Sequence, residues 1–226
     1  MKVGSITTDI IRNGLVFNMD AANRASTVPS TSTLKTFNTV DTAVSGSIVT
    51  DSTWEDGSPS SFDFDGTDGY INTNMDLSSY NSLSVEVWFK LSSNSGVRYL
   101  FAAGSSVSTK GEALGIAANN GQYSQFYTWD GNTSNYFTTG ISQNEWSHIL
   151  ITQEGIIRKV YINGAFLTTI SNAGSLNLDS NTDIGNWTGG GAEMNGNINN
   201  VHIYNRALSA NEVLHNYNAL KGRFGL

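Results

Sequence analysis

The chain of 226 residues contains no cysteine, only two prolines and only three histidines. The absence of cysteine excludes disulfide bonds, thiolate catalysis and zinc sites with cysteine ligands. The histidines, His148, His202 and His215, do not stand at a spacing that is typical of a metal site. The fold must therefore rest on a hydrophobic core, which a chain of this length can bury without help from metals or disulfides.

Positive charge and long apolar runs are also scarce. The sequence has 12 Lys and Arg against 19 Asp and Glu, which gives a net charge of −7. Without a basic patch, binding to nucleic acid is not expected, and without a run of about 18 apolar residues, neither is membrane insertion. Residues 1–13 lack the apolar stretch of a secretory signal, so we expect a protein made in the cytoplasm without a signal peptide.

Glycine is abundant instead, with 23 residues, and Asn, Ser and Thr cluster between short apolar runs, which is typical of strands joined by tight turns. Val85, Val87, Phe89 and Leu91 recur at a period of two, which predicts a strand with one face in a core. Similar runs predict further strands at 14–20, 61–72, 99–103, 113–118, 124–129, 146–153, 158–162, 166–170, 182–185 and 197–204.

Two of the connections are typical of hairpins. Asn163-Gly164 and Asp130-Gly131 each follow a predicted strand and suit a tight two-residue turn. Because no helical pattern is interleaved to carry parallel crossovers, the strands are expected to pair antiparallel. The sequence therefore predicts an all-β fold, a single domain over residues 1–226 made of two stacked antiparallel sheets in a sandwich or jelly roll.

One helix is expected near the end of the chain. Ser209 and Glu212 form a capping box, which predicts a short helix over 209–219. The segment 26–59 is rich in Ser, Thr and Asp with weak periodicity. It is therefore interpreted as a long irregular excursion, with one candidate strand around 47–50.

Five sequence blocks follow one another in an order that resembles a known family. They are GLVFNMDAAN at 14–23, FDGTDGYI at 64–71, SVEVWF at 84–89, EWSH at 145–148 with VYING at 160–164, and IYNRALS at 203–209. Together they resemble the laminin G-like branch of the concanavalin A-like jelly rolls. The resemblance implies a jelly-roll sandwich with one short C-terminal helix, but the functions of this family are mixed.

A narrower resemblance lies at the two ends of the chain. DAAN at 20–23 and the tail NYNALKGRFGL at 216–226 resemble segments of virion structural proteins of tailed bacteriophages. This resemblance implies a non-enzymatic structural or surface-display protein located in the virion, whose partners are capsid, tail or fibre proteins. The lack of cysteine agrees with assembly in a reducing cytoplasm.

The tail at 220–226 ends with two large apolar side chains, Phe224 and Leu226, which are unfavourable in water. We expect the tail to fold back onto the sandwich beside Leu15 and Phe17, because chain ends of such domains lie at the surface and close together. The alternative is that the tail anchors the domain to the particle.

Three aspartates, Asp63, Asp65 and Asp68, supply the oxygen ligands that calcium prefers. Calcium is therefore the one candidate cofactor, although Asp next to Gly also forms turns without metal. Asn199 and Asn200 stand where members of the resembling family carry an acidic pair. This loss of negative charge implies at most a weak calcium site.

Catalysis is not expected. Glycoside hydrolysis needs two carboxylates at a defined separation, and the string Glu-x-Asp-x-x-Glu of the resembling glucanases does not occur. Glu86 is the one acidic residue in a clear core strand, where its neighbours on the same face are Ser84 and Trp88. A glycan hydrolase is thus a remote alternative.

Binding to a cell-surface glycan is a stronger candidate activity. Aromatic rings stack on the apolar faces of sugars while Asn and Asp bind hydroxyl groups. Trp129 and Trp187 stand beside turn residues. Together with Asp130, Asn132 and Tyr136, which lie near Trp129 in the sequence, they are the predicted glycan contacts. The same aromatic side chains could instead pack in the core or against a neighbouring virion protein, and an independent lectin is the alternative to a virion component.

Overall fold

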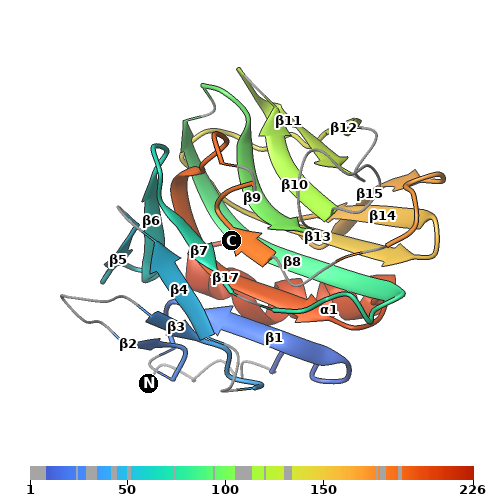
Figure 1. Ribbon diagram of the computed structural model, residues 1–226, viewed down its shortest axis with the longest axis horizontal. Helices are drawn as coiled ribbons and strands as arrows, with labels where there is room; N and C mark the ends of the chain where they lie inside the picture. Colours follow the sequence, from blue (N-terminus) through green and yellow to red (C-terminus); the bar gives the residue numbers. More distant parts are fainter. Residues whose placement is uncertain are drawn as a thin grey trace.

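The computed structural model describes residues 9–23, 25–28, 35–41, 45–49, 52–73, 75–93, 95–104, 114–119, 121–129, 134–176, 178, 182–187 and 190–226. Within these residues, strands form two antiparallel sheets that stack as a sandwich, and one helix follows near the end of the chain (Figure 1). The predicted fold class, an all-β sandwich with a C-terminal helix, is confirmed.

The first sheet has eight strands among the described residues. Its order is β15 (Ala165–Ile170), β14 (Ile157–Ile162), β13 (Trp146–Glu154), β8 (Ser82–Ser93), β17 (Asn195–Tyr204), β6 (Ser61–Asp65) and β5 (Thr53–Glu55). β1 (Leu15–Asp20) also pairs with β17, with Leu15 opposite Tyr204. The first and last strands among the described residues are thus neighbours.

The second sheet has nine strands among the described residues. Its order is β12 (Ser134–Thr138), β11 (Gln122–Trp129), β10 (Leu114–Asn119), β9 (Arg98–Ala103), β16 (Thr182–Ile184), β7 (Tyr70–Asn72), β4 (Ser45–Val49), β3 (Lys35–Phe37) and β2 (Thr27–Val28). Each sheet has an inner face that packs in the sandwich and an outer face.

The core lies between the two inner faces. Val85, Val87 and Phe89 of β8 are fully buried there, as the period of two predicts. The rings of Phe89 and Phe126, from opposite sheets, approach to 5.7 Å between centroids. The alternate residues of β8, among them Glu86, must therefore face outward.

The segment 26–59 differs from its interpretation as an irregular excursion. The structure places four short strands there, β2 to β5, and only β4 lies near the predicted strand at 47–50. Strands of two to five residues are too short to show a period of two. Gly46 permits close packing, since a Cβ atom there would lie 2.5 Å from Cγ2 of Thr36 and 2.8 Å from Cγ2 of Ile71.

Two predicted local motifs are confirmed. Asn163 and Gly164 adopt positive φ angles of 48° and 76° in the turn between β14 and β15, as a tight hairpin requires. The capping box is present as well, with the Ser209 backbone N–H donating to Glu212 at 2.8 Å. The Asp130-Gly131 turn lies outside the described residues.

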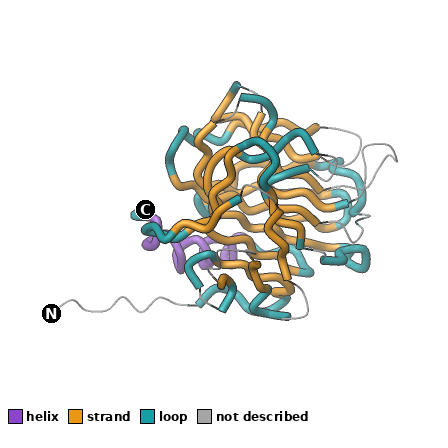
Figure 2. Tube along the Cα trace, turned by 60° about the vertical axis from the view of Figure 1, so that its left-hand side comes forward, coloured by secondary structure: helices purple, strands orange, loops and turns teal. Residues whose placement is uncertain are grey.

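Helix α1 (Ala210–Leu220) continues into a short 3-10 helix, η1 (Lys221–Phe224). α1 packs on the outer face of the eight-stranded sheet, and the chain ends beside it (Figure 2). Among the described residues, no helix combines the length and apolar character needed to cross a membrane.

The tail folds back onto the domain, as expected, but not at the expected place. The Phe224 ring stacks on Trp88 at 4.0 Å between centroids, with an interplanar angle of 6°. Leu15 instead packs with a hydrophobic cluster that includes Val213 of α1, and Phe17 is part of the inner core. Neither residue was therefore available to the tail.

A polar contact completes the attachment of the tail. Arg223 donates from Nη1 to Asp20 Oδ1 at 2.8 Å and to Asn199 Oδ1 at 3.0 Å. Asp20 Oδ1 also accepts from the backbone N–H of Ala22 at 2.9 Å, so this carboxylate caps the turn after β1. The tail thus connects to β1 through charge and to β8 through aromatic stacking.

Phe224→Ala is expected to lower the free energy of unfolding by about 1–3 kcal/mol, because it removes the ring that covers Trp88. Urea denaturation of the whole chain measures this change. Leu226→Ala is the matched control, since Leu226 is 50% exposed and its loss should cost no more than about 0.5 kcal/mol. Equal effects of the two substitutions would contradict the packing role of Phe224.

Candidate functional site

One row of residues crosses the outer face of the nine-stranded sheet. Tyr136 of β12 lies opposite Tyr127 of β11, which lies opposite Ala117 of β10, and Ala117 lies opposite Tyr99 of β9. Directly opposed residues on paired strands project from the same face. The register therefore brings three tyrosines from three strands onto one surface.

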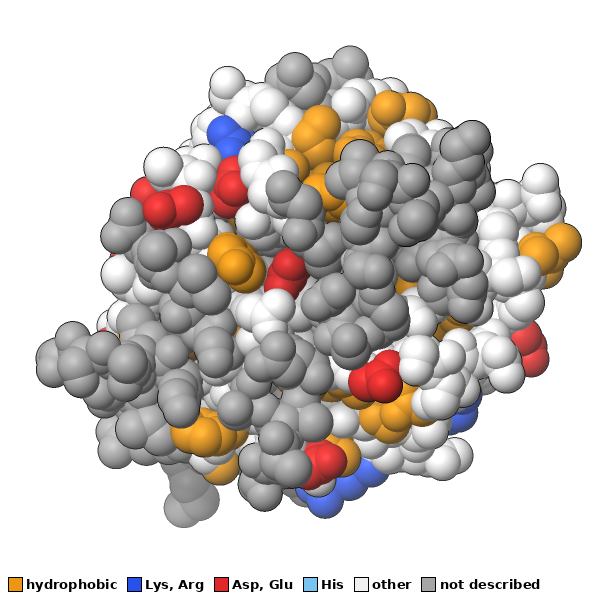
Figure 3. Space-filling model, viewed as in Figure 1, with side chains coloured by type: hydrophobic (Ala, Val, Ile, Leu, Met, Phe, Trp, Pro, Cys, Tyr) orange, Lys and Arg blue, Asp and Glu red, His pale blue; other side chains and the backbone are white. Residues whose placement is uncertain are grey.

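These tyrosines and Trp187 form a continuous set of ring contacts, called the aromatic row below. Ring centroids lie 5.2 Å apart for Tyr127 and Tyr136, 6.0 Å for Tyr99 and Tyr127, and 5.1 Å for Tyr99 and Trp187. The small side chain of Ala117 lets Tyr99 and Tyr127 meet across β10, where their hydroxyl groups lie 3.4 Å apart. Figure 3 shows hydrophobic side chains gathered over this part of the sheet.

The members of the aromatic row differ in exposure. Tyr99 and Tyr127 are only 7% and 6% exposed, and burial raises the pKa of both phenols above the ordinary value of 10.0. Tyr136 is 57% exposed, and Trp187 is half-buried. The two buried rings therefore support two accessible ones, whose surfaces a ligand can contact.

Trp187 is held in place by the two residues before it. Gly185 has a φ of 82°, and a Cβ atom there would lie 2.6 Å from the ring of Phe64. The chain can therefore turn out of β16 only with glycine at this position. Asn186 Oδ1 then accepts from the Trp187 backbone N–H at 2.7 Å.

A polar pair lies beside the aromatic row on the same face. Asp183 of β16 is opposite Asn72 of β7 and Ala102 of β9, and Ala102 packs with Tyr99. Asn72 Nδ2 donates to Asp183 Oδ1 at 2.7 Å. Burial raises the pKa of Asp183 from 3.8, and the bond from Asn72 partly offsets this.

Sequence analysis identified part of this face. Of the predicted glycan contacts, Tyr136 and Trp187 belong to the aromatic row. The Trp129 side chain, Asp130 and Asn132 lie outside the described residues. Asp183 and Asn72 were missed, because each lies in a strand of three residues. In each of these strands the polar residue stands next to an isoleucine, and this pattern was the one sign in the sequence that the residue could belong to a site.

The three aspartates predicted for calcium lie on β6 and in the turn that follows it. Asp63 accepts from Asn197 Nδ2 at 3.0 Å, and Asp65 Oδ1 accepts from the Thr67 backbone N–H at 2.8 Å. Asp68 is exposed in the turn. Among the described residues, no three His, Cys, Asp or Glu side chains are grouped to hold a metal. Calcium binding stays a prediction.

A buried polar cluster lies on the outer face of the eight-stranded sheet, beneath α1. Glu86 of β8 is fully buried. It contacts His148 Nε2 at 3.0 Å, His202 Nδ1 at 3.2 Å and Asn216 Nδ2 at 2.8 Å. Asn216 also donates to the Tyr204 hydroxyl at 2.8 Å. These groups come from three strands and the helix, so sequence spacing could not relate them.

Electrostatics keeps the Glu86 carboxyl ionised. Burial is the largest influence and would raise its pKa, but the hydrogen bonds and charges of His148 and His202 outweigh it. The net result is a pKa well below the ordinary value of 4.5. Glu86 is thus a structural anion that holds α1.

Residues 65–214 match the profile of a laminin G family, described as the concanavalin A-like lectin/glucanases superfamily. The chain belongs to this superfamily. Its two antiparallel sheets have the expected architecture. No curated protein matches the sequence of this concanavalin A-like domain.

Solved structures share the fold at low identity. Trypanosoma rangeli sialidase matches with a TM-score of 0.67 and 16% identity, over 93% of this chain and 33% of that one. Another match is domain 4 of AbnA, an extracellular arabinanase from Geobacillus stearothermophilus, solved in complex with arabinotriose. Its TM-score is 0.64 and its identity 20%, over 88% of this chain and 96% of that one. The receptor-binding domain of botulinum neurotoxin type G matches with a TM-score of 0.65 and 14% identity, over 91% of this chain and 51% of that one. The concanavalin A-like domain thus spans a third of the sialidase.

Glu86→Gln is expected to lower the free energy of unfolding by about 3 kcal/mol at pH 7, because it breaks a buried charged network. Since the folded pKa of Glu86 is depressed, its stabilisation is present above pH 4.5 and is lost as the pH falls below that value. Denaturation of both proteins between pH 7 and pH 3 measures this. A difference that stays constant over the whole range would refute the assignment.

Proposed function

We propose that this domain is a non-enzymatic carbohydrate-binding module displayed on a virion, and that the aromatic row contacts the glycan. The observation that carries the proposal is the continuous row of Tyr136, Tyr127, Tyr99 and Trp187 on the outer face of one sheet. The Asp183–Asn72 pair supplies polar groups beside it.

This arrangement suits the chemistry of sugars. A pyranose ring has apolar faces that stack on aromatic rings and hydroxyl groups that need hydrogen-bond partners. Tyr136 and Trp187 offer ring surface, while Asp183 accepts and Asn72 both donates and accepts. Tyr99 and Tyr127 are buried, with their hydroxyl groups 3.4 Å apart, so they support the accessible rings from below.

The environment of Glu86 supports binding without catalysis. A glycosidase needs two carboxyl groups that reach the scissile bond. Glu86 is fully buried beneath α1, and its oxygens bind His148, His202 and Asn216. This carboxylate is therefore removed from contact with a polysaccharide.

The fold neighbours support a saccharide ligand in a limited way. Domain 4 of AbnA is described in complex with arabinotriose, and the sialidase is described with sialic acid. At identities of 20% or less these structures share the fold, so they indicate that such a sandwich can belong to a sugar-binding protein. The ligand of this chain must be sought by experiment.

Tyr136→Ala is expected to weaken glycan binding about threefold to tenfold, because it removes an exposed ring worth about 0.5–1.5 kcal/mol in stacking. A glycan array that includes arabinotriose identifies the ligand, and calorimetry measures the affinity. Phe166→Ala is the matched control, since Phe166 is 56% exposed and lies on the other sheet.

Equal loss of binding in Tyr136→Ala and Phe166→Ala would contradict the proposal that the aromatic row contacts the glycan. Incubation of the bound glycans with the protein should release no reducing ends. Release that is abolished by Asp183→Asn would instead favour the hydrolase alternative.

Placement on a virion is supported by the segments at the two ends of the chain that resemble phage structural proteins. The structure brings these segments together, because Arg223 of the tail donates to Asp20 after β1 at 2.8 Å. A module attached to a particle needs a surface separate from its ligand site. The outer face of the eight-stranded sheet, with the tail on it, supplies one.

The virion placement predicts that the protein is retained on particles purified through a density gradient and washed in high salt. Quantitative mass spectrometry should give a copy number that matches a symmetric virion component. Recovery only in the soluble fraction would favour the independent lectin.

A further inference from the structure

The strand β12 forms one end of the nine-stranded sheet (Figure 1), and no described strand pairs with its free edge. An edge strand presents backbone N–H and C=O groups that can pair with a strand of another chain. Proteins usually protect such an edge with charged residues, proline, a β-bulge or a very short strand.

In the described part of the chain, the other ends of the two sheets carry such protection. β2 has only two residues, and β5 has three, which include Glu55. The ladder between β15 and β14 shifts its register between Val160 and Tyr161, as at a β-bulge. β12 has five uncharged residues, no proline and an unbroken register with β11, so its edge is unprotected.

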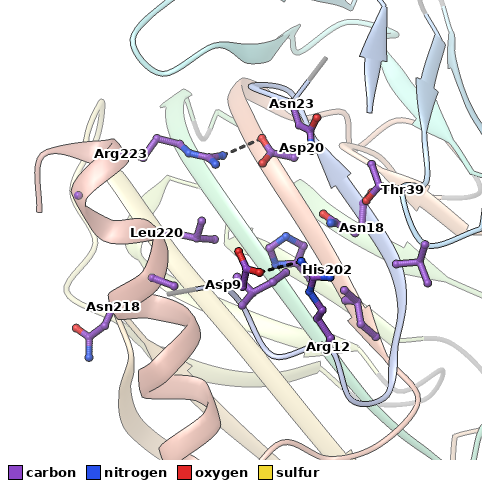
Figure 4. A pocket seen from close by; sticks show the side chains of 15 residues that line it. Asp9, Arg12, Asn18, Asp20, Asn23, Thr39, His202, Asn218, Leu220 and Arg223 are labelled. Carbon is purple, nitrogen blue, oxygen red and sulfur yellow. Dashed lines mark hydrogen bonds and ion pairs between the residues drawn. The ribbon is translucent and has the colours of Figure 1, made fainter. Parts of the chain in front are cut away.

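The strand β1 has a second side as well, but other parts of the chain occupy it. β1 borders the groove that lies between this strand and α1 with η1 (Figure 4). On the side away from β17, the Asn18 N–H donates to Asn38 Oδ1 at 2.9 Å, and the Asn18 C=O accepts from the Thr39 N–H at 3.1 Å. The backbone of β1 is therefore satisfied here, unlike that of β12.

The hydrogen bonds of β12 to β11 show which of its residues point at the free edge. Thr139 and Ser124 are directly opposed where the register of the two strands continues, and the Thr139 N–H donates to the Ser124 C=O at 2.6 Å. In an antiparallel ladder, such bonded pairs alternate with pairs that are not bonded to each other. Counted back from Thr139 in steps of two, the residues whose N–H and C=O groups point away from β11 are Ser134, Tyr136 and Thr138.

These three residues define one symmetric pairing. When two copies of β12 lie antiparallel, a single register uses all three residues of each copy. In that register Tyr136 lies opposite the same residue of the other copy, and Ser134 lies opposite Thr138. Each outward N–H group of one copy then donates to a C=O group of the other, and a two-fold axis passes beside Tyr136.

The distribution of charge also favours this edge. The chain has a net charge of −7, so two copies repel each other unless they meet at an uncharged surface. The three neighbouring strands β10, β11 and β12 contain no charged residue. A second copy that approaches β12 therefore meets no like charge on these strands.

We propose that β12 is the interface of a symmetric dimer, in which it pairs antiparallel with β12 of a second copy of this chain. The two nine-stranded sheets then become one continuous sheet. Because Tyr136 is one end of the aromatic row, the rows of the two copies meet at the axis on the same outer face. The pairing depends on the backbone of β12, so it stands whether or not the aromatic row binds a glycan.

The mass of the whole chain in solution tests this proposal. Analytical ultracentrifugation without any ligand should detect a species of twice 24.3 kDa, whose fraction grows with concentration. Thr138→Pro removes an N–H group that β11 does not use, so the monomer should keep its thermal midpoint. By symmetry the dimer loses two hydrogen bonds, and its dissociation constant should rise about fivefold to a hundredfold.

Cysteine crosslinking tests the register, because the native chain has no cysteine. Opposed residues of a hydrogen-bonded pair have Cα atoms about 5.5 Å apart, which a disulfide can span. Tyr136→Cys should therefore form a covalent dimer under mild oxidation. Ser134→Cys and Thr138→Cys should crosslink when the two proteins are mixed, but poorly alone, because each residue lies about 14 Å along the strand from its own copy.

Phe166→Cys, at an exposed position on the edge strand β15, is the matched control and should stay monomeric. The proposal is overturned if the native chain sediments as a monomer up to submillimolar concentration, or if Thr138→Pro leaves the dissociation constant unchanged. It is also overturned if Phe166→Cys crosslinks as readily as Tyr136→Cys, or if Ser134→Cys alone crosslinks as readily as the mixture. Since no ligand is present in these measurements, their failure would leave the proposed glycan contact untouched.

Discussion

The buried carboxylate of Glu86 holds the C-terminal helix against the eight-stranded sheet. Without α1, this anion would lie on the outer face of a central strand, and the stacking of Tyr217 and Phe224 on Trp88 would be lost. Histidines from β13 and β17 and an asparagine from α1 satisfy it. Removing any one of them leaves a charge that water cannot reach. The position of the helix, and of the groove beside it, therefore depends on this carboxylate.

The two outer faces of the sandwich are different surfaces. The face of the nine-stranded sheet carries accessible rings, supported by Tyr99 and Tyr127. The face of the eight-stranded sheet is covered by α1 and bordered by paired charges. Ring surface favours stacking, whereas a polar groove favours hydrogen bonds. The two outer faces of this small domain therefore offer different chemistry to a partner.

The sequence was informative where local physics decides the structure. The alternation in β8, the Asn163-Gly164 turn and the capping box at Ser209 depend on neighbours within a few residues, and all three predictions were confirmed. The short strands β2 to β5 are only two to five residues long, so no period revealed them. The Glu86 cluster and most of the aromatic row bring together residues from several strands, which local patterns cannot relate. Single polar residues within apolar strands, as in SVEVWF and SHILI, were the clearest indication available.

The pairing of β1 with β17 has a consequence for synthesis on the ribosome. Leu15 leaves the exit tunnel long before its partner Tyr204, because most of the domain lies between them in the sequence. Until then β1 has an open edge, and the outer face of β8 lacks the helix α1 that covers it. The eight-stranded sheet can therefore be completed only after β17 has left the ribosome. During that interval the nascent chain exposes apolar strands, and it would benefit from chaperones that bind such segments.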